Sequence, residues 1–210
     1  MVRHAPSVHV PPVGARRTTI LEAARRRFSR FGPQKTTMEE VAREAGCSRA
    51  TLYSHFRNKE DLYESLLKAD AEDFIEDVER VLAKPGGARR KIRRIVEITR
   101  TTYAKNRVLR LAVARDGEMS LYPVAHAFAR GQDRRIIDLL RRVLEQGVQE
   151  GSLRTIDPER VAYLMFHLGS FLVARETSGK GDYQFDEIMT VMDDVFDRGI
   201  GKARSRRSGS

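Results

Sequence analysis

The chain has 210 residues, of which 32% are charged and 40% are hydrophobic, a length that fits one or two small domains. Its single cysteine, Cys47, excludes an internal disulfide framework and a metal site made of several thiolates from one chain. No run approaches the roughly 18 apolar residues of a membrane helix, and the first residues lack the apolar core of a signal peptide, so we expect a cytoplasmic protein.

Positive charge is concentrated at the two ends of the chain. Residues 1–60 hold 12 basic and 5 acidic side chains, residues 61–200 hold 23 and 24, and residues 201–210 hold 4 basic ones and no acidic one. This distribution predicts that the N-terminal part binds a polyanion while the nearly neutral remainder has a different task. Nucleic acid and an anionic membrane surface are both candidates on this ground.

The two ends also lack the composition of a folded domain. Residues 1–15 contain three prolines and few large apolar groups, and residues 201–210 are basic and rich in serine and glycine. We expect both segments to be disordered tails, because they cannot bury enough apolar surface to offset the entropy of ordering. Between them apolar residues recur at helical spacing, which predicts an all-α protein.

Three helices are predicted in the basic N-terminal part. The first covers residues 16–31, and its arginine-rich face is most simply interpreted as a solvated surface. The second covers 38–45, where Thr37 and Glu40 have the spacing of a capping box. It ends at a glycine, and the third helix, 48–56, follows at once. Two short helices joined by such a turn form a helix-turn-helix, which presents its second helix to the DNA major groove.

The segment 36–63, TTMEEVAREAGCSRATLYSHFRNKEDLY, resembles the DNA-binding head of TetR/AcrR-type transcriptional regulators. The matching features are a threonine cap, the Ala-Gly-Cys-Ser turn, and a Leu-Tyr-Ser-His-Phe run followed by Lys-Glu-Asp-Leu. The resemblance extends over residues 16–65. It implies a three-helix DNA-binding domain, residues 16–60, followed by a six-helix body, residues 61–200, for ligand binding and dimerisation.

The third predicted helix carries the side chains expected to read DNA. Leu52 and Phe56 share one face, which anchors the helix to the two preceding ones. We expect Arg49, near the helix N-terminus, to bind guanine bidentately, while the methyl group of Ala50 suits thymine. The residues predicted to face outward are Arg49, Ala50, Tyr53 and Ser54.

Phosphate contacts are expected around this helix. Thr37 offers a hydroxyl and a helix N-terminus, Tyr53 and His55 can donate hydrogen bonds, and Lys59 supplies a positive charge. The matching positions of the TetR/AcrR family contact the DNA backbone, which the resemblance implies for this chain. Tyr53 could instead be only a packing residue, and Cys47 fits either a small core residue or a redox sensor.

The rest of the chain is predicted to form six helices. No part of it carries the pattern of a catalytic serine elbow, a phosphate-binding loop or a zinc-binding His-Glu-x-x-His pair. We therefore expect no enzyme, no metal site and no cofactor. The predicted helices cover 59–83, 88–105, 106–115, 120–150, 157–177 and 185–200.

The last two predicted helices are apolar on two sides, and such helices must be buried on two sides. We expect them to pair with their symmetry mates in a four-helix bundle, which makes the protein a homodimer. Phe166 and Met192 are expected at this interface, with Gly169, Ser170 and Ala174 allowing close approach. In the first of these helices, one stripe holds Val161, Leu164, Met165, Leu168 and Leu172, and the other holds Tyr163, Phe166, Ser170 and Val173.

Polar or aromatic side chains on inward helix faces indicate a ligand cavity in the body. The body has almost no net charge, so we expect a small, mainly apolar effector. His167 is more simply interpreted as a core or interface residue than as a ligand contact. The candidate ligand-binding residues are Thr99, Tyr103, His126, Phe128, Phe166 and His167.

These patterns together predict a ligand-responsive, sequence-specific DNA-binding transcriptional regulator. We expect a repressor, because the resemblance to the TetR/AcrR family implies one. We also expect a small molecule to release this repressor from a palindromic operator. Its expected partners are double-stranded operator DNA, the effector and a second copy of the chain, and no membrane. Two other functions remain open at this point: a sequence-indifferent architectural DNA-binding protein, and a helical enzyme or carrier that has kept the head.

Overall fold

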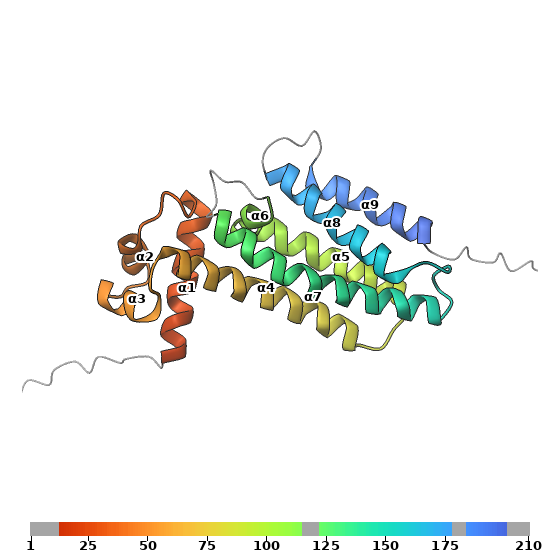
Figure 1. Ribbon diagram of the computed structural model, residues 1–210, viewed down its shortest axis with the longest axis horizontal. Helices are drawn as coiled ribbons and strands as arrows, with labels where there is room; N and C mark the ends of the chain where they lie inside the picture. The colour runs from red at the N-terminus through yellow and green to blue at the C-terminus, as the bar shows by residue number, and fades with distance from the viewer. Residues whose placement is uncertain (1–12, 115–121, 178–183, 201–210) are drawn as a thin grey trace, which may run out of the picture.

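The computed structural model describes residues 13–114, 122–177 and 184–200, and in these ranges every regular element is an α-helix (Figure 1). The predicted all-α architecture is therefore confirmed. None of the helices in the described ranges is both long and apolar enough to cross a membrane. The helices are α1 (Val13–Phe31), α2 (Met38–Glu44), α3 (Arg49–His55), α4 (Lys59–Ala83), α5 (Ala88–Lys105), α6 (Arg107–Ala114), α7 (Tyr122–Gln149), α8 (Pro158–Thr177) and α9 (Phe185–Ile200).

Helix α1 begins at Val13, three residues before the predicted start, whereas the other predicted bounds agree to within two residues. Proline and small residues had indicated a disordered end. The small residues Gly14 and Ala15 are compatible with a first helical turn, because the amides of that turn have no partner within the helix in any case. The remainder of the two predicted tails, 1–12 and 201–210, lies outside the described residues. The hydroxyl of Thr19 donates to the carbonyl of Ala15, one turn earlier (2.9 Å).

Local capping defines the helix-turn-helix as the sequence predicted. The amide of Glu40 donates to the Thr37 hydroxyl (3.3 Å), and the amide of Thr37 donates to the Glu40 carboxylate (2.8 Å), which completes the capping box. Gly46 ends α2 with φ of 60°, in the left-handed region where glycine avoids the strain of a side chain. The hydroxyl of Ser48 then accepts from the amide of Thr51 (3.0 Å) and caps α3.

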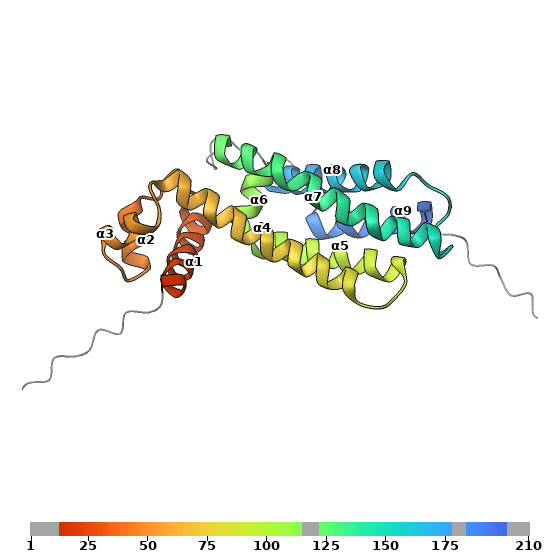
Figure 2. The same ribbon diagram turned by 60° about the horizontal axis from the view of Figure 1, so that its bottom comes forward.

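Helices α1 to α3 form a head at one end of the molecule, and α4 leaves the head and runs along the body (Figures 1 and 2). Phe28 of α1, Leu52 of α3 and Phe56 are fully buried in the core of the head. In the body, α4, α5, α7, α8 and α9 surround a second apolar core. Tyr103, near the end of α5, packs against two apolar clusters: the cluster of the head core, which extends into α4 and α6, and a small cluster around Met189 of α9.

Candidate DNA-binding surface and ligand cavity

Helix α3, the predicted recognition helix, buries and exposes the faces that the sequence predicted. Leu52 and Phe56 are buried, which fixes the helix against the head core. The outward face carries exposed Arg49, Ala50, Tyr53 and Ser54, while His55 is half-buried beside Phe56. This side of the head can therefore lie in a major groove with its side chains toward the bases.

The guanidinium of Arg49 is exposed to solvent, but it already contacts two side chains of the head. Its Nη1 donates to Oε1 of Glu39 on α2 (3.0 Å), and its Cζ lies 5.4 Å from the centre of the Tyr53 ring. About two thirds of the Arg49 side chain (66%) is open to solvent. A guanine would have to compete with the Glu39 carboxylate, whereas the stacking on Tyr53 keeps the guanidinium on the outer face of α3.

The residues predicted to bind phosphate already form hydrogen bonds within the head, and these bonds differ from residue to residue. The amide of Thr37 is paired with Glu40, and this hydrogen bond is the main cause that lowers the pKa of the Glu40 carboxyl. This pairing is part of the predicted capping box, so a phosphate at Thr37 must compete with the Glu40 carboxylate. Lys59 lies in the first turn of α4, where its Nζ donates to the carbonyl of Gln34 (3.1 Å). The Ser54 hydroxyl donates to the carbonyl of Thr51 (2.8 Å) within α3.

The sequence predicted a simple structural role for two further features of the head, the arginine-rich face of α1 and the thiol of Cys47. The arginines of α1 are not a merely solvated face, because Arg25, Arg26 and Arg27 form ion pairs with Asp70, Glu44 and Glu40. Cys47 is half-buried against the head core, and burial raises the pKa of its thiol. A protonated thiol is a poor nucleophile, which favours the interpretation of Cys47 as a small core residue.

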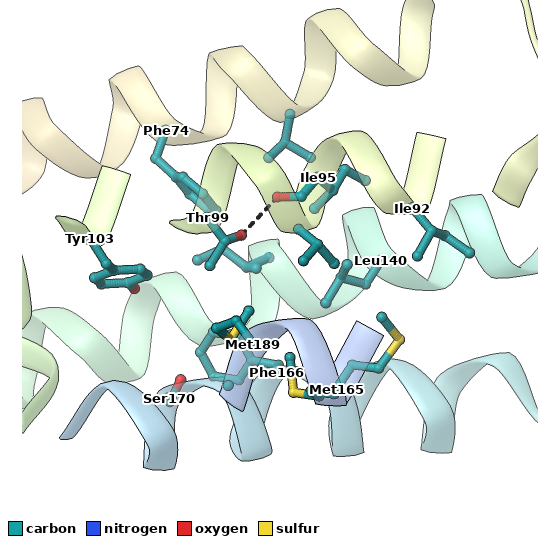
Figure 3. Close-up of a pocket in the computed structure, with 15 residues that line it drawn as sticks. Phe74, Ile92, Ile95, Thr99, Tyr103, Leu140, Met165, Phe166, Ser170 and Met189 are labelled. Atoms are coloured by element: carbon teal, nitrogen blue, oxygen red, sulfur yellow. Dashed lines mark hydrogen bonds between the residues drawn. The ribbon is translucent and has the colours of Figure 1, made fainter. Parts of the chain in front are cut away.

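A cavity of about 70 Å³ lies in the body (Figure 3). A cavity needs at least roughly 10–15 Å³ of such volume to hold one water, so this one has room for a few waters or a small ligand. Three of the predicted ligand residues, Thr99, Tyr103 and Phe166, line it. The full lining is Phe74, Val78, Ile92, Ile95, Val96, Thr99, Tyr103, Ile136, Leu140, Met165, Phe166, Gly169, Ser170, Met189 and Met192.

The other predicted ligand residues are not brought into this cavity. His167 does not line it, and its ring packs against Tyr163 (4.1 Å between centroids) and Phe166 (5.1 Å), which agrees with the simpler interpretation. His126 and Phe128 belong to α7, but their side chains lie outside the described residues. Sequence reasoning missed the walls contributed by α4, α7 and α9, because their inward stripes have the same spacing as any helical core.

The predicted dimer interface needs a correction. Phe166, Ser170 and Met192 line the cavity within one subunit, so they do not form the outer face of α8 and α9. The exposed apolar face instead includes Phe171 (56% exposed) and Val195 (62%). Helices α8 and α9 contact each other and together expose six large apolar side chains, and monomeric proteins rarely leave large apolar patches uncovered. We call this surface the α8–α9 patch; it consists of Tyr163, Leu164, Leu168, Phe171, Val191 and Val195.

The head and the body meet at a buried carboxylate. Asp70 of α4 is only 4% exposed, and it accepts hydrogen bonds from Arg25 of α1 (Nε, 3.1 Å) and from Asn106 Nδ2 (2.6 Å). Asn106 joins α5 to α6, and its Oδ1 accepts from the amide of Leu109 (3.0 Å), which caps α6. The next residue, Arg107, donates to the carbonyl of Ser29 in α1.

Comparison with known proteins identifies the family. The family described as bacterial regulatory proteins, tetR family, matches residues 20–66. An uncharacterized HTH-type transcriptional regulator of Bacillus subtilis, YhgD, is 30% identical over 157 residues, which cover 73% of this chain and 80% of that protein. The chain belongs to the TetR family. The predicted DNA-binding transcriptional regulator is thereby confirmed, and the architectural alternative is not favoured.

Solved structures of transcriptional regulators share the fold over most of this chain. A transcriptional regulator from Saccharomonospora viridis in complex with choline has a TM-score of 0.75 at 20% identity, covering 90% of this chain and 100% of that one. The regulator FadR from Bacillus subtilis in complex with stearoyl-CoA has a TM-score of 0.70 at 21% identity, covering 87% and 98%. At these identities the similarity shows the fold alone.

Proposed function

We propose that this TetR-family regulator is a homodimeric repressor that leaves its operator when a small, mainly apolar molecule occupies the cavity in the body. The observation that carries the proposal is the position of Tyr103. This residue lines the cavity, packs against the head core, and stands three residues before Asn106, whose side chain binds the carboxylate tied to α1. The structures with choline and stearoyl-CoA show that related folds take up small molecules.

The α8–α9 patch supports the homodimer. Its six exposed apolar residues lie on two neighbouring helices, and a twofold axis through such a patch buries the same surface of both subunits. Two heads related by a twofold axis require a pseudo-palindromic operator, with recognition helices roughly 34–36 Å apart or a multiple of one helical turn. Ligand control then needs only a change in this spacing.

The hydrogen bonds of Asp70 supply the coupling between cavity and head. A ligand that changes the position of Tyr103 also moves the junction between α5 and α6, since both belong to the same short stretch of chain. Asn106 transmits the movement to Asp70, and Arg25 transmits it to α1. The ligand thus favours the conformer whose head spacing does not fit DNA, and operator DNA in turn lowers the affinity for the ligand.

Selection of bound sequences from a random DNA pool tests this function. We expect an enriched inverted repeat whose binding survives a large excess of random competitor DNA. An enriched site without twofold symmetry would contradict the dimer, and binding that random DNA abolishes would support the architectural alternative. The enriched site then serves to screen apolar compounds for release of the operator, with thermal shift as the measure of binding.

A further inference from the structure

The lining of the cavity contains no charged side chain within the described residues. Its walls are aliphatic, methionine and aromatic side chains, and the polar groups among the described lining residues are the hydroxyls of Thr99, Tyr103 and Ser170. A charge enclosed there would lose its hydration without gaining an ionic partner from the lining, which costs several kcal/mol. The lining therefore selects against ligands that must bury a charge.

The hydroxyls are collected at one end of the cavity. Along α5 the lining extends from Ile92 to Tyr103, which at about 1.5 Å per residue spans roughly 16 Å. Figure 3 shows Tyr103 and Ser170 toward one side of the view and Ile92 toward the other. The lining thus has a polar end, which is also the end nearest the head, and a longer apolar part. The cavity of about 70 Å³ admits a hydrocarbon chain along this part only when the side chains that line it move apart.

The available hydroxyls call for a hydrogen-bond acceptor. Thr99 already donates its proton to the carbonyl of Ile95 (2.9 Å), so it can only accept (Figure 3). Burial raises the pKa of Tyr103 to about 12, and the negative charge of Asp133 adds to this effect, so the phenol stays protonated. A protonated phenol and a serine hydroxyl can both donate to a ligand oxygen, while the Asp133 charge opposes an anion at the same place.

We infer that the effector is an uncharged, chain-like hydrocarbon with one carbonyl-type acceptor at its end, held by the hydroxyls of Tyr103 and Ser170 at the head side of the cavity. The inference rests on the proposed function, since it takes this cavity as the effector site. It sets the expected ligand apart from a fatty acid carboxylate, from a quaternary ammonium ion and from an acyl-CoA that would have to bring its phosphates inside.

A quaternary ammonium ion is the strongest competitor. The rings of Phe74, Tyr103 and Phe166 line the cavity, and aromatic faces attract such cations. The negative charge of Asp133 near Tyr103 also favours a cation. The lining itself nevertheless offers two hydroxyl donors and no carboxylate, and a cation cannot accept a hydrogen bond from these donors. The choice between the two ligand classes is therefore open to a direct measurement.

The experiment compares five probes with the same decyl chain and different ends. They are decyl methyl ketone, undecanoate, decyltrimethylammonium, undecanoyl-CoA and undecane, each titrated calorimetrically into the full-length protein. We expect the ketone to bind most tightly and to show a carbonyl infrared band shifted by hydrogen bonding. Tyr103→Phe and Ser170→Ala should each weaken ketone binding by about five- to tenfold and reduce the band shift, because each removes one donor.

Two controls separate the hydrogen bond from packing and folding. Undecane should bind the wild-type protein and Tyr103→Phe equally, since it makes no hydrogen bond. Thr101→Val, the same change at an exposed position of α5 that does not line the cavity, should leave ketone affinity unchanged within about twofold. Thermal unfolding of each variant shows whether it is folded.

The outcomes distinguish this inference from the proposed function. Tightest binding by undecanoate, decyltrimethylammonium or undecanoyl-CoA overturns the uncharged class, and release of the operator by that probe keeps ligand control intact. Binding by none of the five probes also overturns the inference, and the operator affinity of the same sample shows whether DNA recognition stands. Ketone binding that Tyr103→Phe and Ser170→Ala both leave unchanged overturns the assignment of the polar end.

Discussion

The head and the body use opposite means to build a binding surface. In the head, polar side chains are exposed and paired with near neighbours, as Thr37 is with Glu40 and Arg49 with Glu39. In the body, five helices enclose a cavity whose described lining has no charge. The phosphates of DNA are the same at every site, so a surface built from residues close together in the sequence is enough to bind them. An effector cavity depends instead on contacts between distant parts of the chain.

The largest expected effect tests whether the body brings two heads together. Phe171→Glu places a carboxylate on the α8–α9 patch, where a symmetric partner would have to bury it without a cation. We expect the protein to sediment as a monomer at micromolar concentration and its operator affinity to fall roughly a hundredfold or more, because each monomer keeps one half-site.

The control for this change is Thr101→Glu, which adds the same charge at an exposed position of α5 away from the patch. It should leave both sedimentation and operator binding as in the wild-type protein. A dimer that persists in Phe171→Glu would mean that another surface joins the subunits, and the α8–α9 patch would then need a different partner.

The second prediction concerns the carboxylate between the two regions. Asp70→Asn turns an acceptor toward the Asn106 amide into a donor and removes the charge that faces Arg25, so we expect a loss of about 2–3 kcal/mol in the free energy of unfolding. Denaturant titration measures this loss. Asp73→Asn, an exposed position on the same helix, should change it by less than about 0.5 kcal/mol.

Function gives a second measure of the same variant. If Asp70 transmits the ligand signal, the effector should still bind to Asp70→Asn but should release the operator less completely. Full release by the effector in this variant would show that the signal reaches the head by another route, although the carboxylate could still stabilise the fold.

A smaller effect is expected on the recognition helix. Arg49→Ala should cost about 1–3 kcal/mol of operator affinity and relax the preference at one base position of each half-site. Lys59→Ala should instead weaken binding to all sequences and reduce the salt slope by about one unit. Selected DNA pools and salt titrations separate these outcomes. An unchanged base preference in Arg49→Ala would remove this residue as the base reader.

The head could be predicted from the sequence almost residue by residue because its decisive contacts are local. Thr37 and Glu40 are three residues apart, and Gly46 has the positive φ expected of a helix stop. The arginines of α1 are the exception. The partner of Arg25 lies 45 residues further along the chain, and a run of arginines in the sequence does not show whether such a distant partner exists.

The helices of the body could be predicted from the sequence, but the sequence did not show which helix faces line the cavity and which are exposed. Periodicity shows that α8 and α9 are apolar on two sides without showing which side meets the cavity and which meets solvent. Phe166 and Met192 were therefore placed at the interface, although they line the cavity. The walls from α4 and α7 could not be recognised, because a cavity arises only when several helices pack together.

The smallest expected effects compare two glycines of the body. A Cβ atom at Gly147 of α7 would clash with the side chain of Leu153 and lie 2.9 Å from Cβ of Ala88, both buried residues, so Gly147→Ala should destabilise the protein by about 1–2 kcal/mol. At Gly169, which lines the cavity on α8, a Cβ would meet no atom within 4 Å. Gly169→Ala should therefore stabilise α8 by about 0.5–1 kcal/mol, the gain of alanine over glycine inside a helix. Denaturant midpoints measure both changes. A destabilised Gly169→Ala dimer would show that the partner subunit approaches α8 closely at this glycine, so that cavity and interface share one helix turn.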